Sequence, residues 1–187
     1  KRCAASGRMR SSTGELELDS KQERVSFRSS RSEGVVLKSG AYAGTFLAVR
    51  DVDTFASLSV HSLDGLPLRE SRSLLLFHLT NTANSGMKFR SADRKLLDSW
   101  GTLPLLARTG RAEVELRIPD GTVEALALDG SCLGRIPVRC SSGRLRFSAR
   151  TNRYADYSVF CYHITRQARK TAESAKSAES VKSISAD

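Results

Sequence analysis

The chain of 187 residues is long enough for one domain with a sizeable core and too short for most two-domain enzymes. Its hydrophobic fraction of 40% and charged fraction of 27% are ordinary for a soluble globular protein. No apolar run approaches the roughly 18 residues of a transmembrane helix, so we expect no membrane span. The first residues also lack the apolar stretch of a signal peptide.

The net charge of +10 directs attention to anionic partners. The first fourteen residues carry four basic side chains and no acid, and the other arginines are spread along the chain among apolar residues. This spread favours an ordinary solvated face over a dedicated polyanion site. Helix-turn-helix, zinc-finger and RNP-type motifs are absent from the sequence, so we favour the solvated face over a nucleic-acid partner.

A basic, Ser-rich lead-in over residues 1–12 precedes the first periodic segments. Leu16 and Leu18 alternate with glutamates, and Val25 and Phe27 alternate with serine and arginine. A period of two predicts strands with one wet face.

Two later runs, residues 74–79 and 157–164, are apolar on both faces. This pattern predicts central strands that are covered on both sides. Between residues 80 and 103 the alternation fails and Asn, Asp and Gly appear, so we expect a long connection with little regular structure. Loops of this length inside compact domains are often functional.

Strand-like runs return after residue 103. Along the whole chain, several such runs end at turn-forming pairs, namely Asp64-Gly65, Asp120-Gly121, Asp129-Gly130 and Ser142-Gly143. Short strands at spacings of about ten residues predict an all-β domain over residues 13–166. We expect an antiparallel β-sandwich of jelly-roll or Greek-key type. Residues 167–187 have no apolar face, which predicts a disordered or weakly helical polar tail.

The cysteines do not have metal-site spacing. The chain has no CxxC pair and only three histidines, so no metal site is predicted. Seven residues separate Cys132 from Cys140 across a predicted hairpin, so a disulfide is conceivable, although spacing cannot establish it. Cys161 is predicted to be a small buried apolar residue.

No catalytic constellation is present in the sequence. Carboxylates such as Asp93 and Asp98 lack a glycosidase signature, no G-x-S-x-G elbow accompanies the histidines, and no phosphate-binding glycine loop occurs. We therefore predict no catalytic residue and no cofactor. His78 and His163 fall inside strands, and the pattern places only His61 in solvent.

The single tryptophan, Trp100, allows two interpretations. Its apolar face suits a pyranose ring, so it could act as a sugar-stacking platform beside the sheet. Alternatively, it plugs one end of the core with its indole N–H bonded locally. We favour the plug.

Several short segments occur in a fixed order: Thr13-Gly14-Glu15-Leu16, Ser62-Leu63-Asp64-Gly65, residues 71–76, Asn84-Ser85-Gly86-Met87, residues 98–106 and Ala127-Leu128-Asp129. The ordered set resembles the C-terminal β-sandwich module of large bacterial proteins related to glycoside hydrolases, in which a (β/α)-barrel precedes the module. The likeness covers roughly residues 12–165. It departs from the family at Ser85, where the family has threonine, and at His163, where the family tends to have an acid.

The resemblance implies an accessory domain, because the acid/base and the nucleophile of the family belong to the barrel. It also implies an N-terminal catalytic barrel in the parent chain as a partner, allows a polysaccharide ligand, and suggests a secreted or periplasmic location. A start without methionine is in keeping with a segment downstream of such a barrel. The candidate ligand or interface residues are Trp100, Asn84, Met87, Asp98 and His61.

Three functional hypotheses follow. The leading one is a non-catalytic accessory β-sandwich module of a carbohydrate-active protein, which packs on the barrel or contacts glycan. The alternative is a stand-alone binding domain whose basic surface recognises an anionic polysaccharide or nucleic acid. A third is a small hydrolase with its site in the connection over residues 80–103.

Overall fold

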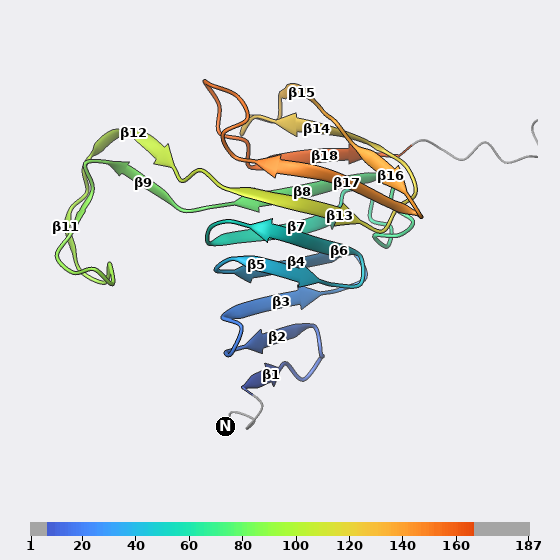
Figure 1. The fold of residues 1–187 in the computed structure, drawn as a ribbon, viewed down its shortest axis with the longest axis horizontal. Helices are drawn as coiled ribbons and strands as arrows, with labels where there is room; N and C mark the ends of the chain where they lie inside the picture. The colour runs from blue at the N-terminus through green and yellow to red at the C-terminus, as the bar shows by residue number, and fades with distance from the viewer. Residues whose placement is uncertain (1–6, 167–187) are drawn as a thin grey trace, which may run out of the picture.

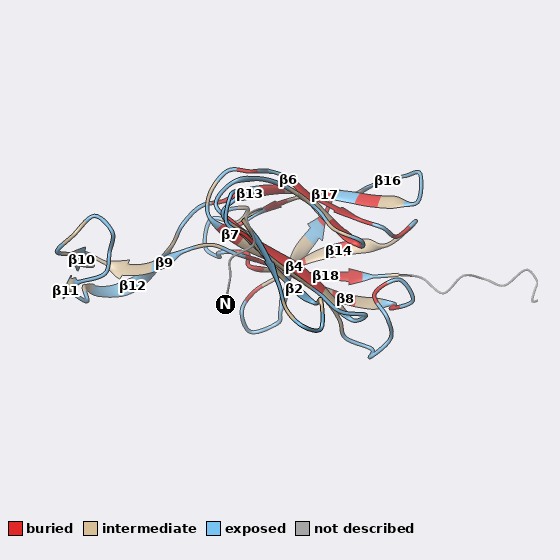
Figure 2. Ribbon diagram, turned by 90° about the horizontal axis from the view of Figure 1, so that it is seen from below, coloured by how far each residue is buried: buried red, intermediate tan, exposed pale blue. Residues whose placement is uncertain are grey.

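The computed structural model describes residues 7–166, and these form antiparallel sheets without a helix. Figure 1 shows the strands and a long arm that projects from one end, and Figure 2 shows two sheets stacked as layers. The prediction of an all-β, sandwich-like fold is confirmed. The predicted tail and the first six residues of the lead-in lie outside the described residues. Within the described part, no helix is long and apolar enough to cross a membrane.

The larger layer is a nine-stranded antiparallel sheet. In spatial order its strands are β1 (Arg8–Arg10), β2 (Leu16–Asp19), β3 (Arg24–Arg28), β4 (Ser32–Leu37), β7 (Ala56–Ser62), β8 (Ser73–Leu79), β18 (Cys161–Thr165), β14 (Thr122–Leu126) and β15 (Cys132–Ile136). The sheet begins at Arg8, inside the predicted lead-in, because β1 pairs with β2. The first three strands extend beyond the smaller sheet (Figure 1).

The smaller layer has five antiparallel strands. In spatial order they are β16 (Arg139–Ser141), β17 (Arg144–Arg150), β13 (Arg111–Leu116), β6 (Leu47–Val52) and β5 (Gly40–Ala43). The core lies between the two layers, where Val35, Leu58 and Leu76 of the large sheet and Val114 and Leu145 of the small sheet are at most 1% exposed. Alternation along each strand places every second residue in this core, and burial of those side chains stabilises the fold.

Strands β8 and β18 are central in the pairing order but covered on one side only. Leu74 and Leu76 are fully buried, whereas Leu75 and Phe77 on the other side of β8 are half-buried. The prediction that these strands are covered on both sides is therefore wrong. Apolar residues on an uncovered side of a sheet produce the same sequence pattern as a strand between two layers.

The buried carboxylate of Glu33 joins the two layers. Glu33 lies on β4 of the large sheet and is 0% exposed. It accepts hydrogen bonds from the backbone N–H groups of Thr45 (2.7 Å), Phe46 (2.6 Å) and Leu47 (3.1 Å), where the chain enters β6 of the small sheet. A side chain at Gly44 would collide with this carboxylate, because an added Cβ would lie 2.0 Å from it.

One of the predicted turns is confirmed in detail, and the predicted Asp64-Gly65 turn is a bend within the longer connection from β7 to β8. Ser142 and Gly143 both have positive φ values, 51° and 70°, as a two-residue type I′ hairpin requires, and they join β16 to β17. Gly65, with a φ of 75°, follows Asp64, whose carboxylate accepts a hydrogen bond of 2.7 Å from the Arg72 N–H. This bond and the others around the carboxylate lower the pKa of Asp64.

The segment predicted as an irregular connection instead forms the arm. Its strands are β9 (Thr82–Ser85) paired with β12 (Thr102–Ala107), and β10 (Lys88–Phe89) paired with β11 (Leu97–Ser99). The expectation of little regular structure is thus wrong for these strands. Both faces of β12 are exposed over its first five residues, so its sequence carries no alternation between wet and buried positions.

We predict that replacing Glu33 with alanine lowers the free energy of unfolding by on the order of 3 kcal/mol or more, because three backbone N–H groups lose their acceptor. Urea unfolding of the wild type and the E33A variant measures this difference. Glu15→Ala, on an exposed position, is the control and should change stability by less than about 0.5 kcal/mol. A small loss in E33A would show that this carboxylate does not join the layers.

Candidate functional site

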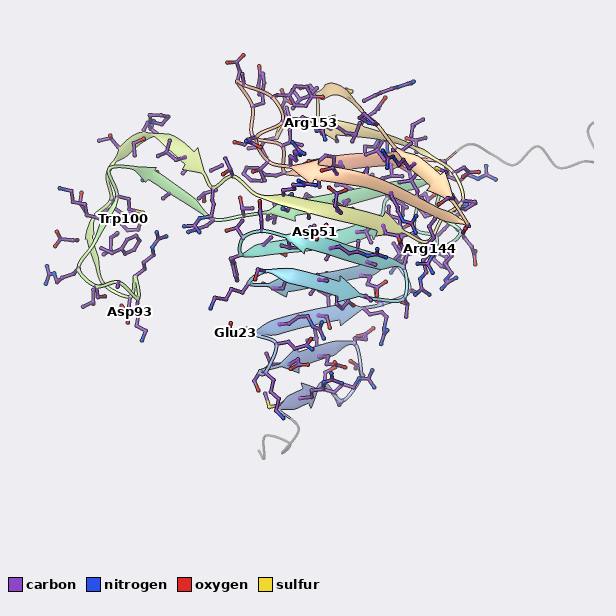
Figure 3. All side chains as sticks on the ribbon, viewed as in Figure 1. Glu23, Asp51, Asp93, Trp100, Arg144 and Arg153 are labelled. Atoms are coloured by element: carbon purple, nitrogen blue, oxygen red, sulfur yellow. The ribbon has the colours of Figure 1, made fainter. Side chains whose placement is uncertain are left out.

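The outward side of the small sheet carries a dense group of arginines, which we call the arginine face. It comprises six arginines and two glutamates, with a net charge of +4: Arg50, Arg111, Glu113, Glu115, Arg139, Arg144, Arg146 and Arg150. These positions alternate with core residues such as Val114 and Leu145, so every one of them points away from the core. Figure 3 labels Arg144, the first residue of β17, which follows the turn from β16.

Glu115 organises the centre of the arginine face. It is only 5% exposed and accepts hydrogen bonds from Arg144 and, at 2.7 Å, from Arg146, while Arg50 lies 3.5 Å away. Burial alone would raise the pKa of Glu115, but the hydrogen bonds from Arg146 and Arg144 outweigh it and hold that pKa below its ordinary value. The carboxylate therefore stays charged and fixes three guanidinium groups in place.

The strand register places arginines directly opposite one another. Arg111 of β13 is the cross-strand partner of Arg150 on β17, and Arg139 of β16 is the partner of Arg146. Like charges at directly opposite positions destabilise a sheet. Arg111 has Glu113 at 2.9 Å, but Arg139 and Arg150 have no carboxylate partner within the described residues. Fold stability alone does not explain this arrangement.

The grouping of these arginines on one face is not evident from the sequence. The alternation along β13 and β17 indicates which residues point outward, Arg144 and Arg146 among them. Strands β6 and β13 are far from β17 in the chain, and their pairing has no local sequence signal. Only the pairing of Arg139 with Arg146 follows from the predicted turn at Ser142-Gly143. Arginines that are scattered along the sequence therefore lie side by side in the structure.

The structure brings four of the five predicted ligand or interface residues together on the arm. The Asn84 side-chain amide donates to the Trp100 carbonyl at 3.0 Å, and the Met87 N–H donates to the Asn84 carbonyl at 3.1 Å. Asp98 lies 3.2 Å from Arg90 on the same arm. His61 lies elsewhere, on β7 of the large sheet.

The prediction that Trp100 plugs the core is wrong. Its side chain is 70% exposed, on the arm and away from the sandwich (Figure 3). A turn with a buried tryptophan and an extended arm with an exposed tryptophan can have the same local sequence of Asp, Trp and Gly. A sugar-stacking role for Trp100 stays a prediction.

The histidines have different environments and do not form a catalytic group. His61 is half-buried rather than fully in solvent, and its ring nitrogens lie 3.0 Å from the Ser32 hydroxyl and 2.9 Å from the Ser59 hydroxyl. His163 lies 2.9 Å from the hydroxyl of Ser73. His78 is fully buried, and burial lowers its pKa to about 4, so this ring is neutral near pH 7.

The cysteines of the described chain are free. Cys132 and Cys140 are exposed and lie in different sheets, on β15 and β16, so the predicted hairpin between them is not present. Cys161 is half-buried on the outer side of β18, and burial raises the pKa of its thiol. Over residues 7–166, no group of three or more His, Cys, Asp or Glu residues is arranged to hold a metal ion.

The carboxylates of the arm do not form the acid pair of a glycosidase site. Asp93 is exposed, accepts a hydrogen bond from the Ser91 hydroxyl and lies 3.1 Å from Lys95, and Asp98 is paired with Arg90. The hydrogen bonds around Asp93, first of all the one from Ser91, lower its pKa. Such a group is a poor proton donor near neutral pH.

Comparison of the chain with known protein families, curated proteins and solved structures finds no match. The fold establishes an all-β, sandwich-like protein and leaves its family open. The resemblance to accessory modules of glycoside hydrolase-like proteins stays a prediction.

We predict that replacing Glu115 with glutamine destabilises the protein near pH 7, by on the order of 1–2 kcal/mol, because charged hydrogen bonds to half-exposed arginines are lost. The pKa of Glu115 is lower in the folded than in the unfolded protein, so the unfolded chain takes up the proton more readily. Its stabilisation is present above its ordinary pKa of 4.5 and is lost as the pH falls below that value.

Urea unfolding of the wild type and the E115Q variant at a series of pH values tests this prediction. The difference in unfolding free energy should be greatest near neutral pH and shrink as the pH falls below the ordinary glutamate pKa. A difference that stays constant across this range would show that the Glu115 charge does not stabilise the fold.

Proposed function

We propose that the protein is a non-catalytic β-sandwich module that binds an anionic polysaccharide through the arginine face. The observation that supports this proposal is the presence of two cross-strand arginine pairs, Arg111 with Arg150 and Arg139 with Arg146. Cross-strand pairs of like charge do not stabilise a sheet. A sulfate or carboxylate group between two guanidinium groups relieves their repulsion and adds charge-assisted hydrogen bonds.

The form of the arginine face supports an extended ligand. Its strands are about 4.8 Å apart and the outward residues along each strand are about 6.8 Å apart, so the charges form a regular array on a rigid sheet. Glu115 holds Arg144 and Arg146 in position before a ligand arrives. Preorganised donors lose less conformational entropy on binding.

The composition of the face favours an anionic polysaccharide over a nucleic acid. The outward positions of β6, β13, β16 and β17 include no aromatic side chain, and base stacking on such side chains is the usual means of holding a single strand. The described chain also has no helix to enter a major groove. Phosphate contacts alone would still give weak, salt-sensitive binding to a duplex.

We predict that Arg139→Gln together with Arg150→Gln weakens binding to heparin, used as the sulfated probe, by roughly tenfold or more. Neither arginine is paired with a carboxylate in the described structure, so the variant should retain its stability. The slope of log K against log salt should fall by about two, because two fewer counterions are released. Binding measured by biolayer interferometry over a salt series gives both numbers.

The matched control is Arg31→Gln together with Arg72→Gln, which removes the same charge from exposed turns of the large sheet. This control should bind heparin nearly as well as the wild type. Equal losses in both variants would mean that net charge, and not the arginine face, drives binding. Tighter binding to a DNA duplex than to heparin at the same salt would favour the nucleic-acid alternative and contradict the proposal.

A second candidate function, packing on a neighbouring domain, is favoured by the outer side of the large sheet. Leu16, Val25 and Leu79 on this side are 54%, 40% and 44% exposed. Apolar side chains that gather on an uncovered sheet mark an interaction surface. This observation is in keeping with the proposed role as an accessory module that packs on a catalytic barrel.

For this second candidate, we expect the reading frame to continue upstream into a (β/α)-barrel with two catalytic carboxylates. In that parent protein, Leu16→Asp with Val25→Asp should leave the unfolding free energy of the isolated module within about 0.5 kcal/mol of wild type, because both residues are exposed. The same changes should speed proteolytic release of the module from the barrel. An initiator codon directly before Lys1 would contradict this role.

A further inference from the structure

A groove lies where the base of the arm meets the end of the sandwich. It has a volume of about 440 Å³, and its lining includes Leu105 and Ala107 of β12, Leu128 and Asp129 of the β14–β15 turn, and Asp156 and Tyr157. Leu128 and Tyr157 are 79% and 55% exposed. The groove therefore offers apolar surface together with two carboxylates, and no lysine or arginine lines it.

The arm beside this groove exposes several large apolar side chains, and no other element of the described residues pairs with its strands. Trp100 is 70% exposed, Leu103 83%, Leu105 60% and Leu96 60%. Strand β12 pairs only with β9, so the arm is a two-stranded ribbon that projects from the sandwich (Figure 1). Isolated two-stranded ribbons are marginally stable in water. A partner that covers this ribbon would stabilise it.

The charges of the arm are opposite to those of the groove. Within residues 82–107 the arm has four basic and two acidic side chains, a net charge of +2. Both acids are already paired, Asp93 with Lys95 and Asp98 with Arg90. Lys88 and Arg94 have no carboxylate partner in the described chain, although the Arg94 guanidinium lies over the Phe89 ring, and Asp129 and Asp156 in the groove have no cationic partner there.

We propose that the protein forms a two-fold symmetric dimer in which the arm of each copy lies in the groove of the other. Only the base of the arm borders its own groove, and the rest of the arm points away from the sandwich (Figure 1), so the arm of a second copy is available as the occupant of the groove. Exposed leucines and Trp100 then cover Leu128 and Tyr157, and the unpaired cations of the arm meet the two aspartates. Two-fold symmetry makes both contacts at once, which doubles the buried area.

The contact is made through side chains and not by adding a strand. Pro104 lies within β12 and has no N–H, and a proline makes a strand a poorer template for pairing with a further strand. The apolar residues on both faces of the ribbon supply the buried area instead. The dimer does not depend on the proposed polysaccharide binding.

Multi-angle light scattering of the full chain, over roughly 1–100 µM, tests the proposal. The wild type should reach twice the chain mass of 20.5 kDa as its concentration rises. Leu103→Asp on the arm and Asp156→Lys in the groove should each weaken the dimer by roughly tenfold or more. Leu63→Asp, the same change on an exposed leucine of the β7–β8 turn, is the matched control and should leave the dimer unchanged.

Mixing two variants tests the pairing of arm and groove directly. An arm variant, Lys88→Glu with Arg94→Asp, and the groove variant D156K should each dimerise weakly alone. Mixed together, they should form a dimer at least tenfold tighter than either alone. One contact then has the wild-type charges, and in the other the acidic arm meets a groove that has no net negative charge. Circular dichroism verifies that each variant is folded.

Three outcomes would overturn the proposal. One is a wild type that stays monomeric over the whole concentration range. Another is a dimer that L103D leaves as tight as the wild type, which would place the interface elsewhere on the molecule. The third is a mixture of the arm and groove variants that dimerises no better than its components.

Discussion

The hydrogen bonds that Glu33 accepts are the constraint on which the arrangement of the two layers depends. One carboxylate on β4 of the large sheet holds the backbone where the chain enters β6 of the small sheet. That contact fixes which residues of β6 face the core, Val49 inward and Arg50 outward. A slip of one residue would exchange the two faces and place arginines in the core. The same pairing register places the arginines of β13 and β17 on the outward side.

The molecule thus presents chemically distinct surfaces on a single scaffold. The arginine face is charged and rigid, because its side chains stand on a paired sheet and Glu115 anchors three of them. The arm and its groove combine exposed apolar side chains with charges of opposite sign, and the outer side of the large sheet carries half-exposed apolar residues among serines and histidines. A dimer would present two arginine faces at once, so an extended anionic polymer could be held by both with increased avidity.

The period of two and the turn pairs could be read from the sequence because they are local properties. Ser142-Gly143 forms a turn and Asp64-Gly65 a bend, and alternation in β13 and β17 separates core residues from outward ones. The strands of the arm cannot be predicted in this way, because they have no buried side and hence no alternation. The exposure of Trp100 cannot be predicted either, because local sequence does not show whether a side chain is covered by another segment. Apart from the hairpin pair Arg139 and Arg146, the arginine face depends on contacts between distant segments, as do the hydrogen bonds of Glu33, and local patterns do not encode such contacts.

Hydrogen–deuterium exchange with and without a sulfated oligosaccharide tests the central claim, that the outward side of the small sheet is the binding surface. The account predicts slower exchange of backbone amides in β6, β13, β16 and β17, and no change in β2 or β3. Protection confined to the arm around Trp100, or to the outer side of the large sheet, would contradict it.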